Sequence, residues 1–153
     1  MVMFKILVVD DEVDFLETIV NRLKKRNLET TGVTSGEDAL EAMKTELFDV
    51  VILDIKMPGG IDGIEALREM KKIQPLAEVI LLTGHASVET SIEGMKLGAF
   101  DYLLKPVKFD DLLQKMAEAF KRKATHDKKI RDAKIQELLR FPGRVFDQEK
   151  DKP

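Results

Sequence analysis

Four aliphatic segments of the chain end in polar residues. The segments are Phe4–Asp11, Asp49–Ile55, Glu78–Gly84 and Phe100–Pro106. The polar residues at their ends are Asp10, Asp11, Asp54, Thr83 and Lys105. Parallel strands place their carboxyl ends at one edge of a sheet, and ligands of open α/β sheets bind beyond that edge. The pattern therefore predicts one shared polar site.

Amphipathic segments alternate with these strands. Apolar positions at helical spacing predict helices over Asp14–Arg26, Ser35–Glu46, Ile64 to the Gln74-Pro75 pair, Ser87–Leu97 and Phe109–Phe120. A weaker strand pattern at Glu29–Val33 completes five strand–helix units. We expect an α/β fold with a doubly wound five-stranded parallel sheet in the flavodoxin-like order 2-1-3-4-5, five helices and a charged C-terminal extension.

Helix ends are marked by small polar residues and glycine. Asp14 is the expected N-cap of the first helix, and Thr34 or Ser35 that of the second. Gly98 is the expected C-cap of the fourth helix.

Composition limits the chemistry and the location. At 153 residues and 44% hydrophobic, the chain has the size of one ordinary domain with an extension. Without cysteine it has no disulfides, thiolate zinc sites or cysteine nucleophiles. No apolar run approaches the roughly 18 residues that span a bilayer, and MVMFKILVVDD becomes acidic too early for a signal peptide. We expect a cytoplasmic protein without membrane contact.

Charge divides the chain into an acidic body and a basic tail. Residues 1–120 carry 14 basic and 22 acidic side chains, whereas residues 121–153 carry 11 basic and 6 acidic ones. We place a domain at 1–122 and a basic, partly helical tail or linker at 123–153, because the apolar stripe breaks at Thr125 to Lys129. The tail also contains six acidic side chains, so we expect no direct DNA binding.

The carboxylates of Asp10, Asp11 and Asp54 predict a metal site. At an effective dielectric constant of about 20, two charges 5 Å apart repel by roughly 3 kcal/mol, and a divalent cation relieves that repulsion. Mg²⁺ suits the group because it takes oxygen ligands and uses only one or two carboxylates directly. With Thr83 and Lys105 beside them, these acids predict metal-assisted phosphoryl chemistry.

The same residues carry a family resemblance. VVDDE, LDIKMPGGIDG, LLTGHAS and DYLLKP are similar to the motifs of the receiver domain of two-component response regulators, over about residues 3–122. The stretch TGHASVETSIEGMKLGAFDYLLKP is most similar to receivers that precede ATPase-type transcriptional activators. The resemblance implies a phosphorylation-controlled switch. By this resemblance, the domain catalyses only its own phosphotransfer and dephosphorylation, and it receives its phosphoryl group from a sensor histidine kinase or phosphotransfer protein.

The resemblance also implies roles for individual residues. Asp54 is the phosphoacceptor, a carboxylate nucleophile that forms an acyl phosphate. Mg²⁺ is bound directly by Asp11, Asp54 and the backbone carbonyl of Lys56, and through water by Asp10. Lys105 and Thr83 contact phosphoryl oxygens.

The resemblance also implies residues for the switch and for tuning the reaction. Tyr102 and Thr83 form the switch, and Lys56 and His85 tune the lifetime of the phosphoryl group. The Lys105-Pro106 bond is expected to be cis. The fourth helix, fifth strand and fifth helix form the output face, which also supports a homodimer.

One departure from the family pattern follows the phosphoacceptor. Gly59-Gly60 in MPGGIDG contains one residue more than receivers usually have. We expect the extra glycine to be absorbed in a bulged turn, because glycine tolerates positive φ.

Two alternatives remain open from the residues. A magnesium phosphatase of the haloacid dehalogenase type would use Asp10 as its nucleophile in a D-x-D pattern, but position 12 is Glu. A flavodoxin needs a Ser/Thr/Gly-rich phosphate loop after the first strand, where this chain has VVDDEVD. The tail leaves a further choice between a stand-alone regulator and a piece of a larger protein.

Overall fold

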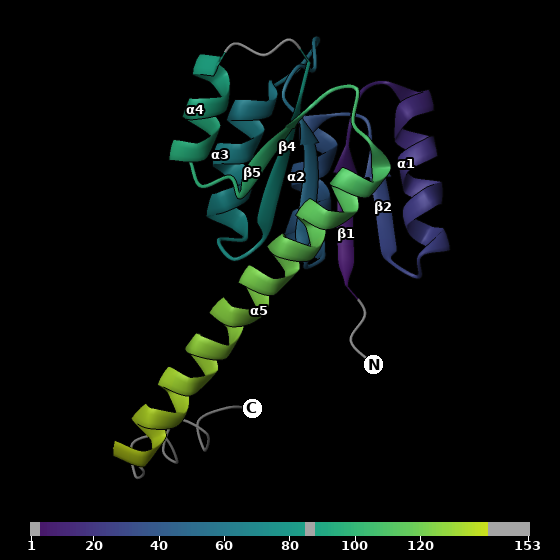
Figure 1. Cartoon of the computed structure of the whole chain (residues 1–153). Helices are drawn as coiled ribbons and strands as arrows, with labels where there is room; N and C mark the ends of the chain where they lie inside the picture. The colour runs from purple at the N-terminus through teal and green to yellow at the C-terminus, as the bar shows by residue number, and fades with distance from the viewer. Residues whose placement is uncertain (1–3, 85–87, 141–153) are drawn as a thin grey trace.

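The computed structural model describes residues 4–84 and 88–140, which form five strands and five helices in alternation (Figure 1). In chain order these are β1 (Lys5–Val9), α1 (Val13–Lys25), β2 (Glu29–Val33), α2 (Gly36–Thr45), β3 (Val50–Asp54), α3 (Gly63–Ile73), β4 (Glu78–Thr83), α4 (Val88–Lys96), β5 (Asp101–Leu104) and α5 (Phe109–Arg140). All strand pairs are parallel, in the order β2-β1-β3-β4-β5. The expected fold and strand order are confirmed.

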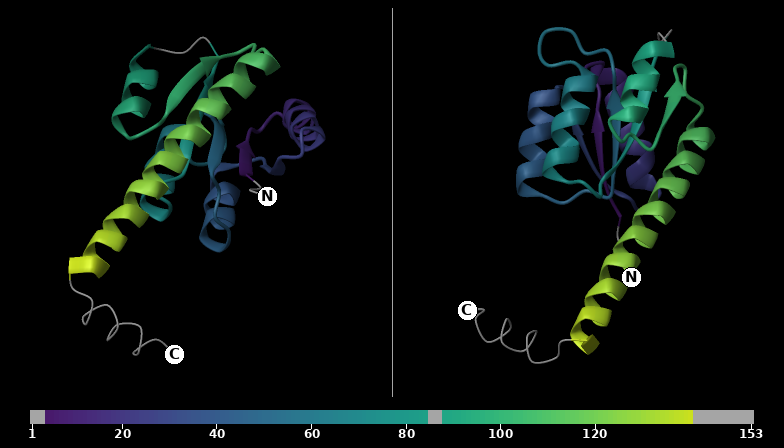
Figure 2. Two further views of the ribbon diagram at one scale, coloured as in Figure 1. Left: turned by 60° about the horizontal axis from the view of Figure 1, so that its bottom comes forward. Right: turned by 90° about the vertical axis from the view of Figure 1, so that its left-hand side faces the viewer.

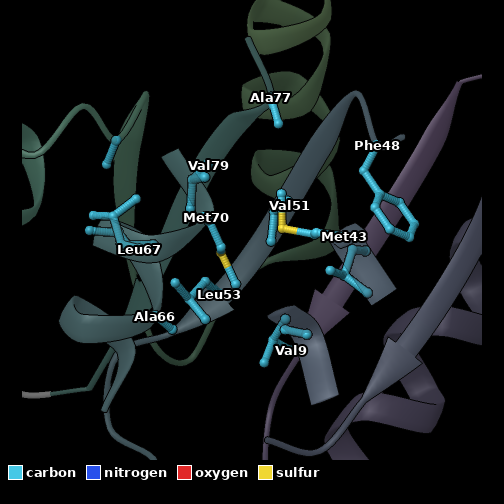
Figure 3. Close-up of a cluster of buried hydrophobic side chains, with 14 of the residues drawn as sticks. Val9, Met43, Phe48, Val51, Leu53, Ala66, Leu67, Met70, Ala77 and Val79 are labelled. Carbon is cyan, nitrogen blue, oxygen red and sulfur yellow. The ribbon is translucent and has the colours of Figure 1, made fainter. Parts of the chain in front are cut away.

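The helices cover both faces of the sheet (Figure 2). Side chains alternate between the faces along each strand, so β3 contributes Val51 and Leu53 to one core cluster and Val50 and Ile52 to the other. The first cluster lies against α2 and α3 and includes Met70 (Figure 3). The second lies against α1 and α5. Strands β3 and β4 are buried along their whole length, as expected for central parallel strands.

Most of the predicted helix ends are correct. The Ser35 side chain accepts the Asp38 N–H at the start of α2. Gly98 follows α4 with a φ of 103°, as a C-cap glycine should. The predicted cap at Asp14 is wrong, because α1 already begins at Val13 and its N-cap is Glu12. The backbone N–H of Glu12 donates to the Asp10 carboxylate at 2.9 Å. A residue of the polar site therefore also fixes the start of α1.

The predicted end of the fifth helix at Phe120 is also wrong. Helix α5 runs without interruption for 32 residues to Arg140 and extends past the sheet (Figure 1). Ion pairs replace the missing apolar stripe: Arg122 pairs with Glu78, and Lys123 lies 3.1 Å from Asp49. The expected division after residue 122 therefore falls inside a continuous helix.

Among the helices of the described residues, none has the length and apolar character needed to cross a membrane.

Candidate functional site

The predicted polar residues come from the carboxyl edge of the sheet. Asp54 and Thr83 are the last residues of β3 and β4, Asp10 directly follows β1, and Lys105 directly follows β5. The Lys105 backbone N–H donates to the Thr83 carbonyl at 2.7 Å, which extends the β4–β5 pairing beyond the strands. The parallel register therefore aligns the ends of four strands whose residues are far apart in sequence.

Three carboxylates form a compact cluster at this edge. One oxygen from each of Asp10, Asp11 and Asp54 lies within 4.8 Å of the others. Asp10 and Asp54 are buried, whereas Asp11 is more exposed. The backbone N–H of Lys56 donates to Asp54 Oδ1 at 3.3 Å, so Asp54 already has one backbone donor.

Lys105 is the ammonium of the cluster. Its Nζ lies 2.8 Å from Asp10 Oδ2 and 3.6 Å from Asp54 Oδ2. Glu12 Oε1 lies 3.8 Å away, and the Phe15 ring centroid 4.7 Å away. The Lys105-Pro106 bond is cis, as expected. Within the cluster Lys105 is therefore hydrogen-bonded to Asp10 and only within electrostatic range of Asp54.

The cluster has more negative than positive charge. Burial and the neighbouring Asp10 raise the pKa of Asp54 from 3.8 to about 6, against the opposing effects of Lys105 and the Lys56 N–H. Burial lowers the pKa of Lys105, but its hydrogen bond and charge interaction with Asp10 outweigh this, and the net shift is upward. Clustered oxygen donors with excess negative charge fit a hard divalent cation.

The loop after Asp54 is fixed at both ends. The Gly63 N–H donates to the Ile55 carbonyl at 2.9 Å, and a Cβ on Gly63 would lie 2.5 Å from the Ile55 Cα. Gly59 has a φ of 92°, which confirms the expected positive φ in the turn. The Glu37 carboxylate of α2 accepts the Ile61 N–H at 3.3 Å. The additional glycine is thus accommodated between fixed ends.

Of the residues with predicted switch or tuning roles, Tyr102 lies on the exposed side of the sheet edge. Tyr102 is on β5, opposite Leu81 in the register, and is 42% exposed. It lies in an exposed apolar patch with Ile92, Met95 and Leu104 on α4 and β5. His85 lies outside the described residues.

Sequence reasoning missed two neighbours of Lys105. Helical spacing assigned Phe15 to the apolar face of the first helix, and the structure does pack it partly against the core. Helical spacing does not reveal that the Phe15 ring also faces the ammonium of Lys105, 90 residues later in the chain. Glu12 was considered only as the residue that breaks the D-x-D pattern.

The sequence matches a known family. Residues 6–117 match the family described as the response regulator receiver domain. Among curated proteins, the transcriptional regulatory protein ZraR of Escherichia coli K12 is 38% identical over 114 residues, which are 74% of this chain and 26% of ZraR. The regulatory protein AtoC of the same strain is 40% identical over 108 residues, 71% of this chain and 23% of AtoC. The chain therefore spans about a quarter of the length of these relatives.

Solved structures give the same result. A CheY-like response regulator receiver domain protein from Methanospirillum hungatei JF-1 has a TM-score of 0.79 at 30% identity, over 82% of this chain and 99% of that chain. A response regulator receiver domain protein from Clostridium thermocellum has a TM-score of 0.75 at 41% identity, over 80% and 98% of the two chains.

Proposed function

This chain belongs to the response regulator receiver family, and from that premise we propose that Asp54 accepts the phosphoryl group. Receiver domains of two-component systems are phosphorylation-controlled switches, so the open question is which residues perform each task. The observation that carries the assignment is the position of Asp54, which is buried at the end of β3 with Oδ2 3.6 Å from Lys105 Nζ.

The two buried aspartates of the cluster have different hydrogen bonds. Asp10 accepts the Glu12 N–H at 2.9 Å through Oδ1 and Lys105 at 2.8 Å through Oδ2. Asp54 accepts a longer bond from Lys56, and its Oδ2 is beyond hydrogen-bond range of Lys105. Asp54 therefore has the freer oxygen for nucleophilic attack, which favours Asp54 over Asp10, the nucleophile of the phosphatase alternative. Family membership gives that alternative no support.

Magnesium is the proposed metal. Asp10, Asp11, Asp54 and the backbone carbonyl of Lys56 would hold it, with Asp10 acting mainly through water. Bound Mg²⁺ supplies positive charge next to the transferring phosphoryl oxygens. The clustered carboxylate oxygens support this choice, because Mg²⁺ prefers oxygen ligands.

The transfer uses the chain's own residues for attack and orientation. An Asp54 oxygen forms a bond to phosphorus as the phosphorus–nitrogen bond of a phosphohistidine breaks, and the bonding electron pair leaves with the imidazole. The phosphoryl oxygens carry the charge of a loose transition state, so electrostatic stabilisation dominates catalysis. Lys105 binds one of these oxygens and the Thr83 hydroxyl another. Attack by water later cleaves the acyl phosphate and restores the Asp54 carboxylate.

The donor is a sensor histidine kinase or phosphotransfer protein in the cytoplasm. Phosphorylation shifts Thr83 and Tyr102 and so alters the α4–β5–α5 face, which controls a homodimer, a partner or a following domain. The exposed apolar patch on α4 and β5 supports this output face. Lys56 and His85 tune the lifetime of the acyl phosphate.

Residues 1–122 act as the receiver, and residues 123–153 as a basic tail or linker. ZraR is named as a transcriptional regulatory protein, and NtrC of Klebsiella pneumoniae as a DNA-binding transcriptional regulator. The basic tail also carries six acidic side chains, so we propose that the chain does not itself contact DNA.

Labelling with acetyl phosphate in the presence of Mg²⁺ tests the phosphoacceptor. We expect one phosphoryl group on the wild-type protein by mass spectrometry, and none on Asp54→Asn. Asp49→Asn is the matched control, because Asp49 precedes the same strand at its opposite end. Full labelling of Asp54→Asn would refute the assignment, and a label on Asp10 would restore the phosphatase alternative.

A further inference from the structure

The aromatic ring of Phe15 faces the ammonium group of Lys105. We propose that Phe15 is a positioning residue, which holds the Lys105 ammonium in the crevice and thereby sets the rate of phosphotransfer to Asp54. The effect on rate rests on the proposed function of Asp54, whereas the placement of Lys105 is independent of it.

The surroundings of Lys105 are mostly negative. Its Nζ has Asp10 at 2.8 Å, Asp54 at 3.6 Å and Glu12 at 3.8 Å, with the Phe15 ring centroid at 4.7 Å. The Lys105 side chain is 19% exposed, so part of its hydration is replaced by these contacts. A cation within about 6 Å of a ring centroid is attracted to the ring face, and the attraction grows as water is removed.

The ring has a more fixed position than the lysine. Phe15 lies in the first turn of α1, and its side chain packs against the buried cluster formed with α1 and α5. Lys105 reaches the site on a flexible four-carbon stem, which has many rotamers in the absence of contacts. A fixed ring beside the ammonium reduces that freedom before any phosphoryl group is present.

An aromatic ring suits this task better than another acid. A further carboxylate would compete with the phosphoryl group for Lys105 and would add negative charge beside Asp54, whose pKa is already raised. The ring attracts the ammonium through its quadrupole and leaves the three N–H donors for oxygen acceptors. Lys105 can therefore keep its contact with Phe15 while it exchanges one carboxylate for a phosphoryl oxygen.

Substitution of the ring gives the first test. We expect Phe15→Leu, which keeps an apolar side chain, to slow labelling by acetyl phosphate roughly three- to tenfold. Magnesium affinity should not change, because Phe15 has no oxygen near the acidic cluster. Phe15→Tyr keeps the ring and should restore the rate.

A matched control separates this effect from loss of packing. Phe100 also lies under a cation, with Arg122 4.7 Å from its centroid, and it packs against the same core cluster. We expect Phe100→Leu to label at the wild-type rate at a temperature where both variants are folded. In a Lys105→Ala background, Phe15→Leu should cause no further loss of rate, because the group that it positions is absent.

Nuclear magnetic resonance tests the placement without phosphotransfer. The Lys105 methylene protons beside the ring should show ring-current shifts that disappear in Phe15→Leu and remain in Phe100→Leu. Unchanged Lys105 shifts in Phe15→Leu would overturn the inference, as would a full effect of Phe15→Leu in the Lys105→Ala background. Absence of any label on the wild-type protein would instead overturn the proposed function.

Discussion

The two edges of the sheet differ in how their acidic side chains are paired with basic ones. At the carboxyl edge, Asp10 and Asp54 both lie near the Lys105 ammonium, and Asp11 adds a third carboxylate to the cluster. At the amino edge, acids and bases are matched: Glu78 pairs with Arg122, Asp49 lies 3.1 Å from Lys123, and Glu46 lies 3.0 Å from Lys5.

Burial does not account for this difference. Glu78 is 2% exposed and Asp54 is 4% exposed, yet only Glu78 has a bidentate guanidinium partner. An unpaired buried charge costs stability, so an edge that keeps an excess of carboxylates needs a compensating function. In the proposed function the carboxyl edge would hold a cation and a phosphoryl group, whereas the ion pairs of the amino edge attach α5.

The largest expected effect concerns Asp54 and pH. Its pKa is about 6 in the fold and about 3.8 when unfolded, so the folded protein binds more protons between these values. Stability of the metal-free protein should therefore fall as pH rises from 4 to 7, by on the order of 3 kcal/mol from this group. Urea unfolding at several pH values measures the change.

Asp54→Asn isolates this contribution. The variant has no carboxylate at position 54, so its free energy of unfolding should not show the decrease that deprotonation of Asp54 causes. The variant should therefore become more stable relative to the wild type as pH rises. Saturating Mg²⁺ at pH 7 should stabilise the wild type more than the variant. If the free energies of unfolding of the two proteins changed equally with pH, the prediction that the buried Asp54 charge costs stability would be wrong.

Loss of the main pair at the amino edge should have the next largest effect. Arg122→Met leaves the Glu78 carboxylate buried without its partner, and we expect a loss of about 2 kcal/mol, reduced because Arg122 is itself partly exposed. Adding Glu78→Leu should recover much of the loss, because the uncompensated charge is removed. Equal destabilisation by Arg122→Met and by the exposed control Lys72→Gln would show that the pair has no special role.

A smaller effect is expected at the second attachment of α5. Lys123 lies 3.1 Å from Asp49 and 3.0 Å from Asp127, with 19% of its side chain exposed. Lys123→Met should cost about 1 kcal/mol in thermal or urea unfolding, and the cost should shrink in high salt. A loss that is independent of salt would point to packing rather than charge.

The smallest effect concerns the two ends of β4. Strand β4 has Thr83 at the carboxyl edge and Glu78 at the amino edge. Beryllofluoride with Mg²⁺ should alter amide exchange near Thr83 and Tyr102 while exchange near Glu78 stays the same. Unchanged exchange at both ends would mean that the described chain does not switch.

Local patterns were enough to predict the sheet and the carboxyl edge. Each strand-end residue follows an aliphatic run, so parallel order alone brings Asp10, Asp54 and Lys105 together. Local sequence was also enough to predict a helix cap such as Ser35. It was not enough to predict the pairing of Glu78 with Arg122, because the two residues are 44 positions apart and each resembles an ordinary surface charge. The same separation in sequence hid the contacts just past the predicted end of α5, where Arg122 and Lys123 pair with Glu78 and Asp49.

Helix α5 is packed on the core along its first half, through Phe109, Leu112, Met116 and Ala119, and projects beyond the sheet in its second half. At about 1.5 Å per residue, its 32 residues span roughly 48 Å, and Arg122 and Lys123 join it to the sheet. With this attachment as the fulcrum, a tilt of about 5° would move Arg140, roughly 25 Å beyond it, by about 2 Å. The displacement of Arg140 is therefore set by the length of helix that extends beyond the last attachment to the sheet, at Lys123.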